Sequence, residues 1–395
     1  MALAKYADGT WSALGPIDGF TFSVVKYRDT LLIGGYFDMG IGTTSLCVEF
    51  YDGDAWQPYG EFDYGADVRR LRVINDTLYA VGSFSSVDGQ VSNGVAKRVG
   101  GTWVPVGAFP DPGQIVLDIV EYRDTLVVIG YVTFPTGRGI AYLDTDGQWK
   151  LLGPGILGGM SGAHSLAVYQ NDLYVGGQIS LPAGNAGQEI MKWNGTAFEG
   201  LGQGLQWSEN NTSSFCDVRA MVEHDGLLFI GGGCNYAGGI PSHGVAVWDG
   251  TRWCSVPGQP NQQQGIMGMD FYRDTLFITC GYIADGDSVN LAAKFVGTDY
   301  IDSCAASVGI GEIVPPGAVT PTIAQTADGQ WQVSGLSAGQ HPYVVIDALG
   351  RLVQNGSLPG GDRSVIPTND LKMGVYLVRV VGFPAQKVLL ISPAR

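Results

Sequence analysis

Residues that could carry out catalysis are sparse in this chain of 395 residues. Its four histidines are His164, His224, His243 and His341, and each would need a serine or cysteine beside it to act as the base of a nucleophile. No Gly-x-Ser-x-Gly elbow, phosphate-binding loop or His-Glu-x-x-His motif is present. The sequence therefore leaves enzyme activity undecided and favours its absence. The alternative is an extracellular carbohydrate-active or other hydrolytic enzyme that uses two of the 37 acidic residues.

Two arginines, Arg70 and Arg219, stand at matching places just before an apolar run. If these runs are strands around a common centre, the two guanidinium groups would face each other and could bind an anionic or sugar ligand. The alternative is that each arginine forms an ion pair with a local acid, such as Asp67 or Asp217. We count both arginines as candidate ligand residues.

Aromatic and histidine side chains in the middle of the chain give a second group of candidates. Trp207 and Tyr236 lie in long polar stretches, where they could stack on sugar rings or instead cap the loops that carry them. His164 and His243 join the candidate ligand residues. No Cys-x-x-Cys pair or histidine cluster predicts a metal site, and we expect no cofactor.

The positions of two cysteines bear on the cellular compartment in which the protein works. Cys216 opens one predicted strand and Cys234 closes the next, so the two would lie nearly opposite each other and could form a disulfide, with buried free thiols as the alternative. A disulfide favours an oxidising, extracellular setting.

These candidates are positioned by a repeat. The segment Tyr27-Arg28-Asp29-Thr30-Leu31, followed by an apolar strand, returns five times, at 74–78, 122–126, 169–173, 224–227 and 272–276. Matching residues recur every 47 to 54 positions. A sustained period near fifty residues is typical of propellers and solenoids.

Each copy is followed by a second hairpin with an Asp-Gly-like turn and an aromatic residue, such as Asp52-Gly53-Asp54-Ala55-Trp56 and Asp249-Gly250-Thr251-Arg252-Trp253. Two hairpins give the four strands of one propeller blade. We predict an all-β protein in which residues 1–304 form a six-bladed β-propeller. The strand of Trp11 repeats the aromatic strand ahead of the first copy, and we expect it to complete the last blade and close the ring, with the segment of Tyr300 as the alternative outer strand.

The net charge and the lengths of the apolar runs disfavour two classes of protein. A net charge of −15 disfavours nucleic-acid binding, which needs a basic face. No apolar run is long enough for a transmembrane helix, and the first residues lack the apolar core of a signal peptide, so any signal peptide is missing from this chain.

The repeat resembles kelch propellers, because strands ending in Gly34-Gly35, Gly176-Gly177 and Gly231-Gly232 are followed by an aromatic residue and then by an aromatic strand. The resemblance covers about residues 10–304 and implies a fold, not a function. The tight turns would lie on one face of the ring and the long, variable connections on the other. Because variable loops on a rigid scaffold usually carry binding, we expect the ligand on the loop face, mainly at blades 4 and 5.

Residues 305–319 interrupt the repeat and are predicted to be a linker. Strands are predicted at 330–334, 343–347, 352–356, 363–367, 374–381 and 387–391, so residues 320–395 should form a small immunoglobulin-like β-sandwich. This tail resembles the type A C-terminal sorting domain of the type IX secretion system of Bacteroidetes, with a generic immunoglobulin-like module as the alternative. The resemblance rests on Asp347, Gly350, Arg351, Gly374, Tyr376 and Lys387.

The resemblance implies the type IX secretion machinery as a partner and a location outside the cell or on the outer-membrane surface. Asp followed by Thr or Ser and an aliphatic residue is similar to the O-glycosylation signal of secreted Bacteroidetes proteins, although turn chemistry alone also explains the pattern. It occurs at Thr30, Thr77, Thr125, Thr275 and Ser288. The sequence thus predicts a secreted or surface-displayed propeller that binds a glycan or a protein.

Overall fold

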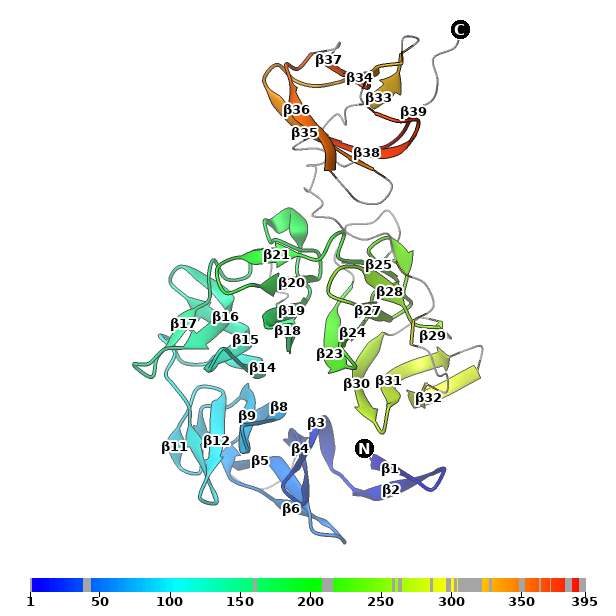
Figure 1. The fold of residues 1–395 in the computed structure, drawn as a ribbon. Helices are drawn as coiled ribbons and strands as arrows, with labels where there is room; N and C mark the ends of the chain where they lie inside the picture. The colour runs from blue at the N-terminus through cyan, green and yellow to red at the C-terminus, as the bar shows by residue number, and fades with distance from the viewer. Residues whose placement is uncertain are drawn as a thin grey trace. The chain divides into compact units, whose positions relative to one another are not determined.

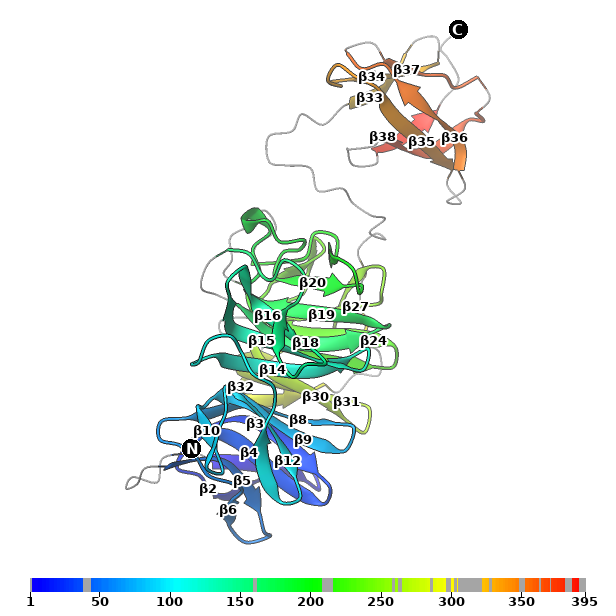
Figure 2. The ribbon, with the colours of Figure 1, turned by 90° about the vertical axis from the view of Figure 1, so that its left-hand side faces the viewer.

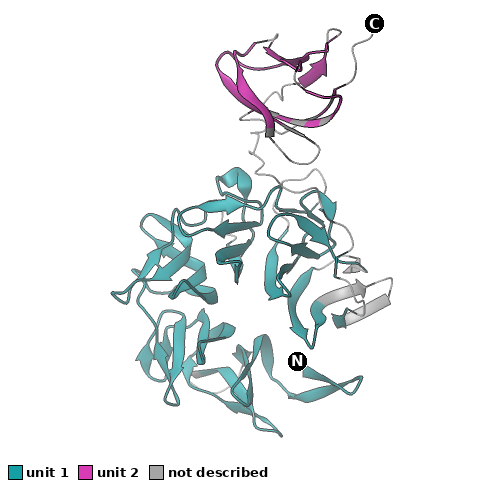
Figure 3. Ribbon diagram, viewed as in Figure 1, with its two compact units in different colours: residues 1–308 teal, residues 309–395 magenta. Residues whose placement is uncertain are grey.

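The structure is a computed structural model. It describes residues 2–37, 44–158, 162–207, 216–257, 260–261, 265–284, 287–295, 300–301, 304, 322–326, 329–347, 352–361, 364–369, 371–380 and 386–390. The chain divides into two compact units, Met1–Val308 and Gly309–Arg395, which are considered separately (Figure 3). The predicted linker at 305–319 lies outside the described residues.

Unit 1 is built from antiparallel sheets that follow one another around a common centre (Figure 1). We number the main sheets 1 to 6 by their first strands, β3, β8, β14, β18, β23 and β30, which we call the inner strands because they lie closest to that centre. Each inner strand from β3 to β23 contacts the inner strand of the next sheet.

Sheets 1 to 3 are composed as follows. Sheet 1 contains β3 (Gly19–Tyr27), β4 (Thr30–Phe37), β5 (Thr44–Tyr51) and β6 (Trp56–Pro58), extended by β7 (Phe62–Asp63), β10 (Ser86–Val87) and β11 (Gln90–Val91). Sheet 2 contains β8 (Asp67–Ile74), β9 (Thr77–Ser83), β12 (Val95–Val99) and β13 (Thr102–Pro105). Sheet 3 contains β14 (Ile115–Tyr122), β15 (Thr125–Phe134), β16 (Gly137–Leu143) and β17 (Trp149–Leu151).

Sheets 4 to 6 repeat the arrangement. Sheet 4 contains β18 (Ala163–Tyr169), β19 (Asp172–Gly177), β20 (Ile190–Trp193) and β21 (Phe198–Gly200), with the 3₁₀ turn η1 (Leu181–Ala183) after β19. Sheet 5 contains β23 (Val218–His224), β24 (Leu227–Gly232), β27 (Val245–Trp248) and β28 (Trp253–Ser255). Sheet 6 contains β29 (Pro260–Asn261), β30 (Ile266–Tyr272), β31 (Thr275–Ala284) and β32 (Asp287–Lys294).

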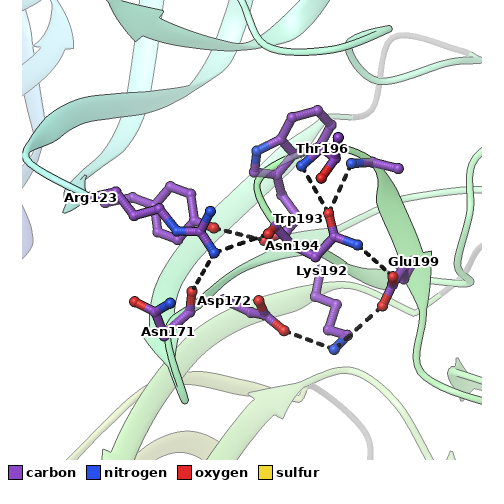
Figure 4. Close-up of polar contacts among 10 residues, drawn as sticks. Arg123, Asn171, Asp172, Lys192, Trp193, Asn194, Thr196 and Glu199 are labelled. Carbon is purple, nitrogen blue, oxygen red and sulfur yellow. Dashed lines mark hydrogen bonds and ion pairs between the residues drawn. The ribbon is translucent and has the colours of Figure 1, made fainter.

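The repeated Asp-Thr-Leu segment forms the tight turn between the first two strands of a sheet. Both central turn residues have positive φ at Asn75–Asp76 and Arg123–Asp124. This is the geometry of the two-residue turns that match the twist of antiparallel strands. The same face carries contacts between sheets: Nη2 of Arg123 donates hydrogen bonds to the carbonyl oxygens of Asn171 and Asn194 in sheet 4 (Figure 4).

Tryptophans that are buried or partly buried connect neighbouring sheets by the same hydrogen bond at several places along the chain. The indole Nε1 of Trp56, Trp103, Trp149 and Trp253 donates to the carbonyl oxygen of Leu14, Tyr59, Val106 and Leu201 respectively. Each acceptor follows the aromatic residue of the preceding outer strand by three positions. The apolar core is likewise divided among the interfaces between sheets, as in the cluster of Leu32, Val68 and Leu71 between sheets 1 and 2.

The N-terminal strand, which is predicted to close the ring, pairs with no strand of sheet 6 among the described residues. The strand of Trp11, β2 (Thr10–Pro16), pairs with β1 (Ala2–Ala7), and the two form a sheet of their own. In sheet 6 the third strand is β32, and Tyr300 packs against Phe295 as the next aromatic residue. The hairpin lies between sheets 6 and 1 (Figure 1).

Two disulfides are present in unit 1. The predicted bond joins Cys216 to Cys234. The second joins Cys254 to Cys304 and was not anticipated. No helix among the described residues is long and apolar enough to cross a membrane.

Unit 2 contains two antiparallel sheets (Figure 2). One contains β33 (Thr322–Gln325), β34 (Trp331–Ser334) and β37 (Ser364–Ile366), and the other contains β36 (Leu352–Leu358), β35 (His341–Asp347), β38 (Gly374–Val380) and β39 (Gln386–Leu390). Residues from both sheets share one core, in which Trp331 is fully buried against Tyr376.

Candidate functional site

Every inner strand contains a β-bulge at the same place. In each hairpin the register shifts by one residue on the inner strand, as between Thr21 and Ser23 in β3 and between Val218 and Ala220 in β23. A bulge leaves one residue unpaired and redirects its side chain. We call the six unpaired residues the bulge ring: Phe22, Arg69, Leu117, His164, Arg219 and Met267.

The bulge ring combines cationic and apolar side chains that remain partly accessible. Arg69 and Arg219 expose 40% and 43% of their side chains, and Phe22 and Met267 are also exposed. Neighbours around the ring touch: the guanidinium carbon of Arg69 lies 4.7 Å from the centre of the Phe22 ring, and Arg219 Nη1 lies 3.1 Å from Met267 Sδ. The ring therefore offers hydrogen-bond donors beside apolar surface, a mixture that suits sugars and polar peptide segments.

Each bulge arginine is held by an aspartate two residues earlier. Arg69 makes two hydrogen bonds of 2.8 Å to Asp67, and Arg219 Nε donates to Asp217 at 2.9 Å. The other oxygen of Asp217 lies 2.7 Å from Nδ1 of His164, which belongs to sheet 4. Asp217 thus fixes two bulge-ring side chains, and it neutralises part of the positive charge that Arg219 would present to an anion.

The predicted pairing of Arg70 with Arg219 rests on an alignment that is one residue out of register. In β23 the residue equivalent to Arg70 is Ala220, while Arg219 occupies the bulge and is equivalent to Arg69. Arg70 Nε instead lies 3.6 Å from Asp118. Arg70 therefore forms an ion pair within the scaffold, with a different acid from the one expected, whereas Arg219 pairs with Asp217 as the alternative reading stated.

Asp118 is an important residue that sequence reasoning left unassigned. It is fully buried, and its two oxygens accept hydrogen bonds of 3.0 and 2.7 Å from Arg72. It also accepts the backbone N–H of Leu166 in sheet 4 at 3.0 Å. Burial would raise the pKa of Asp118, but the charges of Arg72 and Arg70 outweigh it and hold the pKa below its ordinary value. Asp118, on the inner strand of sheet 3, therefore connects that strand to the inner strands of sheets 2 and 4.

Glu189 is a second unassigned carboxyl group, just before β20. It is fully buried, accepts the N–H of Ile179 at 3.0 Å and a hydrogen bond from Gln188 at 2.7 Å, and has a positive φ of 61°. Burial raises the pKa of Glu189 to about 8, against the effect of both hydrogen bonds, and the charge of Asp217 adds to the rise. The sequence does not indicate that Glu189 is buried or that its pKa is raised, because the residue lies in a connection that does not repeat.

The predicted loop residues of sheet 5 gather on a small sheet of β22 (Leu205–Gln206), β25 (Tyr236–Ala237) and β26 (Ile240–Pro241). Tyr236 pairs with Gln206, and the side chain of Asn235 donates to the carbonyl oxygen of Trp207 at 2.9 Å. The backbone N–H of His243 also donates to the carbonyl oxygen of Asn235. Trp207, Tyr236 and His243, which we call the loop platform, therefore share one support.

The loop platform is tied to the strand that carries Arg219. Cys234, just before Asn235, forms the disulfide with Cys216, and Gly233 donates its N–H to the carbonyl oxygen of Asp217. The described residues contain no group of three or more His, Cys, Asp or Glu side chains placed to hold a metal ion.

The remaining predicted residues that the structure describes lie on strands. Thr30, Thr77, Thr125 and Thr275 each begin the second strand of a sheet and are half-buried, and Ser288 lies in β32. In unit 2 the partner of Asp347 is Tyr376, whose hydroxyl donates to the carbonyl oxygen of Lys372 at 2.6 Å. Gly374 pairs with Leu390 and Lys387 with Leu377, while Gly350 and Arg351 lie outside the described residues.

Comparisons with known proteins add the following. No protein-family model and no curated protein matches the chain. A computationally designed protein, Ika8, is similar over 95% of this chain and 98% of its own, at 14% identity and a TM-score of 0.40. PorZ, described as a surface component of the type IX secretion system of Porphyromonas gingivalis, is similar over 98% of this chain, at 14% identity and a TM-score of 0.42. The chain spans 62% of the length of that PorZ chain.

A Trypanosoma rangeli sialidase in complex with sialic acid is similar over 99% of this chain and 82% of its own, at 12% identity and a TM-score of 0.39. At these identities and scores the likeness says nothing about what this chain binds or does.

Proposed function

We propose that unit 1 is a six-bladed, kelch-like β-propeller that binds a glycan or a protein outside the cell. The observation that carries the proposal is the bulge ring, because one residue of each sheet is redirected from the same strand position while its chemistry changes from sheet to sheet. A purely structural bulge would not need arginine, histidine and phenylalanine at equivalent places. Non-repeating side chains on a repeated scaffold are the usual form of a binding surface.

The ligand is expected to contact both the bulge ring and the loop platform. Arg219 is held in place by Asp217 and keeps 43% of its side chain accessible. Such a preorganised guanidinium loses little entropy when it donates to a hydroxyl or carboxylate oxygen. Trp207, exposed to 38%, supplies an aromatic face for a sugar ring or an apolar side chain.

Unit 2 is proposed to be an immunoglobulin-like sorting domain that directs export through type IX secretion, with that machinery as its partner. The proposal is supported by the two antiparallel sheets of unit 2 and by Asp347 and Tyr376, two residues of the resemblance, which are cross-strand partners. Two disulfides in unit 1 support a final location outside the cell or on the outer-membrane surface. Glycosylation at Thr30 and its equivalents remains part of the same proposal, for which an intact mass of natively secreted protein is the test.

The alternative, a hydrolytic propeller, would need two carboxyl groups that both reach the substrate. Glu189 has a raised pKa of about 8 and lies near enough to Asp217 to be affected by its charge. Glu189 is fully buried and Asp217 is 5% exposed and engaged with Arg219 and His164. This pair therefore supports a scaffold role, and binding is the function that the geometry favours.

The test is an array of glycans and proteins probed with the full chain, followed by affinity measurements on each hit. We expect Arg219→Ala to weaken binding at least tenfold, about 1.4 kcal/mol, while Arg138→Ala, an exposed arginine on β16, leaves it unchanged. Equal affinities for both variants and for Trp207→Ala would refute the proposed site. Export is tested separately: removal of residues 309–395 should retain the protein inside a host that has type IX secretion.

A further inference from the structure

Asp217 divides its two carboxylate oxygens between two side chains of the bulge ring. Oδ2 accepts a hydrogen bond of 2.9 Å from Nε of Arg219, and Oδ1 lies 2.7 Å from Nδ1 of His164. The equivalent aspartate of sheet 2, Asp67, is used differently, because Arg69 bonds both of its oxygens through Nε and Nη2. We call His164, Asp217 and Arg219 the Asp217 cluster, an arrangement that the repeat does not require.

The hydrogen bonds to Asp217 determine what the cluster offers to a ligand. A carboxylate accepts and does not donate, so Nδ1 of His164 carries the proton and Nε2 of the neutral ring is left as an acceptor. Arg219 uses Nε on Asp217 and Nη1 on Met267, and within the described chain neither its Nη2 nor the histidine Nε2 has a partner. The two side chains are 43% and 22% exposed. One donor and one acceptor, held by the same carboxylate, are therefore accessible side by side.

The Asp217 cluster has no net charge when its histidine is neutral, because the charge of Arg219 is balanced by that of Asp217. Glu189 adds no charge at neutral pH: burial raises its pKa to about 8, with a further rise from the charge of Asp217, so its carboxyl group is mostly protonated. An acidic ligand would meet no net positive charge here and would have to approach the carboxylate of Asp217. The cluster therefore favours an uncharged ligand.

Apolar side chains flank the Asp217 cluster in the bulge ring. Met267, which contacts Arg219, is 55% exposed, and Leu117, which is half-buried, has the equivalent place in sheet 3, next to sheet 4. A sugar ring suits such a surface, since it carries hydroxyl groups beside apolar C–H faces and each hydroxyl both donates and accepts. The edge of a peptide strand would bring its next carbonyl groups against Leu117 and Met267, whose side chains donate no hydrogen bonds.

We propose that the Asp217 cluster binds two neighbouring hydroxyl groups of an uncharged sugar residue. One hydroxyl donates to Nε2 of His164, and the adjacent hydroxyl accepts from Nη2 of Arg219. A carboxylate ligand would satisfy the arginine but has no proton to donate to Nε2. The inference rests on the proposed binding function, and it narrows the ligand from glycans and proteins in general to neutral glycans that carry a free vicinal diol.

The first test compares glycans that differ in one group. The full chain is probed at neutral pH on immobilised oligosaccharides ending in galactose, glucose, mannose or fucose. The same glycans are included after cleavage of their vicinal diols with periodate and reduction with borohydride, together with the galacturonic, glucuronic and mannuronic acid counterparts. We expect at least one neutral glycan to bind, periodate treatment to abolish its binding, and the uronic acid counterpart of a bound hexose to bind at least about tenfold more weakly.

The outcomes separate this inference from the proposed function on which it rests. If only acidic glycans or proteins bind, and Arg219→Ala weakens their binding, the proposed function stands and the neutral-sugar inference is overturned. Neutral-glycan binding that survives periodate treatment also overturns it. If no glycan or protein binds in a way that depends on Arg219, both are overturned.

Substitutions at His164 test the acceptor. His164→Phe keeps a planar ring without nitrogen and should weaken binding of the neutral glycan about fivefold, the effect of one hydrogen bond. His164→Gln should recover part of the loss, because its amide oxygen can take the place of Nε2. His341→Phe, the same change in unit 2, is the matched control and should leave the affinity unchanged. Equal affinities of wild type and His164→Phe would refute the proposal.

Asp217→Asn tests the charge balance. The amide keeps the size of the carboxylate but leaves the charge of Arg219 unbalanced, so the preference for a neutral hexose over its uronic acid counterpart should fall at least about tenfold. Melting temperatures confirm that each variant is folded. An unchanged preference in folded Asp217→Asn would contradict the charge argument, and the periodate and His164 comparisons decide the proposal without any change at this buried residue.

Discussion

The buried carboxyl group of Glu189 should make unit 1 less stable as the pH rises, and a single substitution should remove this pH dependence. Its carboxyl group is fully buried, and burial raises its pKa from 4.5 to about 8. The folded state therefore keeps a proton that the unfolded state has already released at neutral pH. The loss of folding stability that Glu189 causes is absent below pH 4.5, grows as the pH rises to 8, and is constant above that.

The size of the effect follows from the same two values. The difference between 4.5 and about 8 corresponds to about 5 kcal/mol above pH 8, and to about 3 kcal/mol at pH 7. Glu189→Gln cannot ionise and still offers an oxygen to the N–H of Ile179. The substitution should therefore cost little at pH 5 and stabilise unit 1 by several kcal/mol at pH 9.

The assay is urea unfolding followed by tryptophan fluorescence at pH 5 and pH 9, with the disulfides intact. What matters is the difference between the wild type and Glu189→Gln at each pH, because the other titrating groups cancel. Glu61→Gln, at an exposed position just before β7, serves as the control and should show no such change. If the stability difference between wild type and Glu189→Gln were the same at both pH values, the buried carboxyl group would not be the cause.

Three further outcomes can be measured on the same protein. Asp118→Ala should destabilise unit 1 by about 3–5 kcal/mol in urea, because two arginines lose their buried counter-charge; a loss below 1 kcal/mol would contradict its role. Replacing both Cys216 and Cys234, 18 residues apart, by alanine should cost about 3 kcal/mol under oxidising conditions and nothing extra under reducing ones. Trp253→Phe should cost at least about 1 kcal/mol through the lost bond to Leu201, and an unchanged melting temperature would argue against the tryptophan rule.

The repeat was predictable because its signals are local. The Asp-Thr-Leu segments and the Asp-Gly turns need positive φ, and residues such as Asp76, Asp124 and Gly250 have it. The buried outer-strand tryptophans also follow from the spacing, since Trp103 and Trp253 are fully buried. The six-blade count, the closing strand and the domain limits stay predictions.

The chemistry at the inner strands was harder to predict, for two physical reasons. A bulge adds one residue without leaving a mark in the apolar pattern, so Arg219 was aligned with Arg70 when it belongs with Arg69. Ion pairs between sheets join residues about one repeat apart, as Arg72 and Asp118 do over 46 positions. Neither the alignment of single strands nor local charge spacing reveals such partners.

Hydrogen bonds between inner strands join some neighbouring sheets but not all of them. Ser23 Oγ accepts the N–H of Leu71 in the next sheet at 3.0 Å, and Asp118 accepts that of Leu166 in the same way. The equivalent residue of sheet 6 is Gly268, which has no side chain with which to accept the N–H of Val24. Sheet 5 likewise has no side-chain acceptor at this position, since its equivalent residue is Ala220, and yet its inner strand contacts that of sheet 6, so apolar packing alone can join neighbouring inner strands.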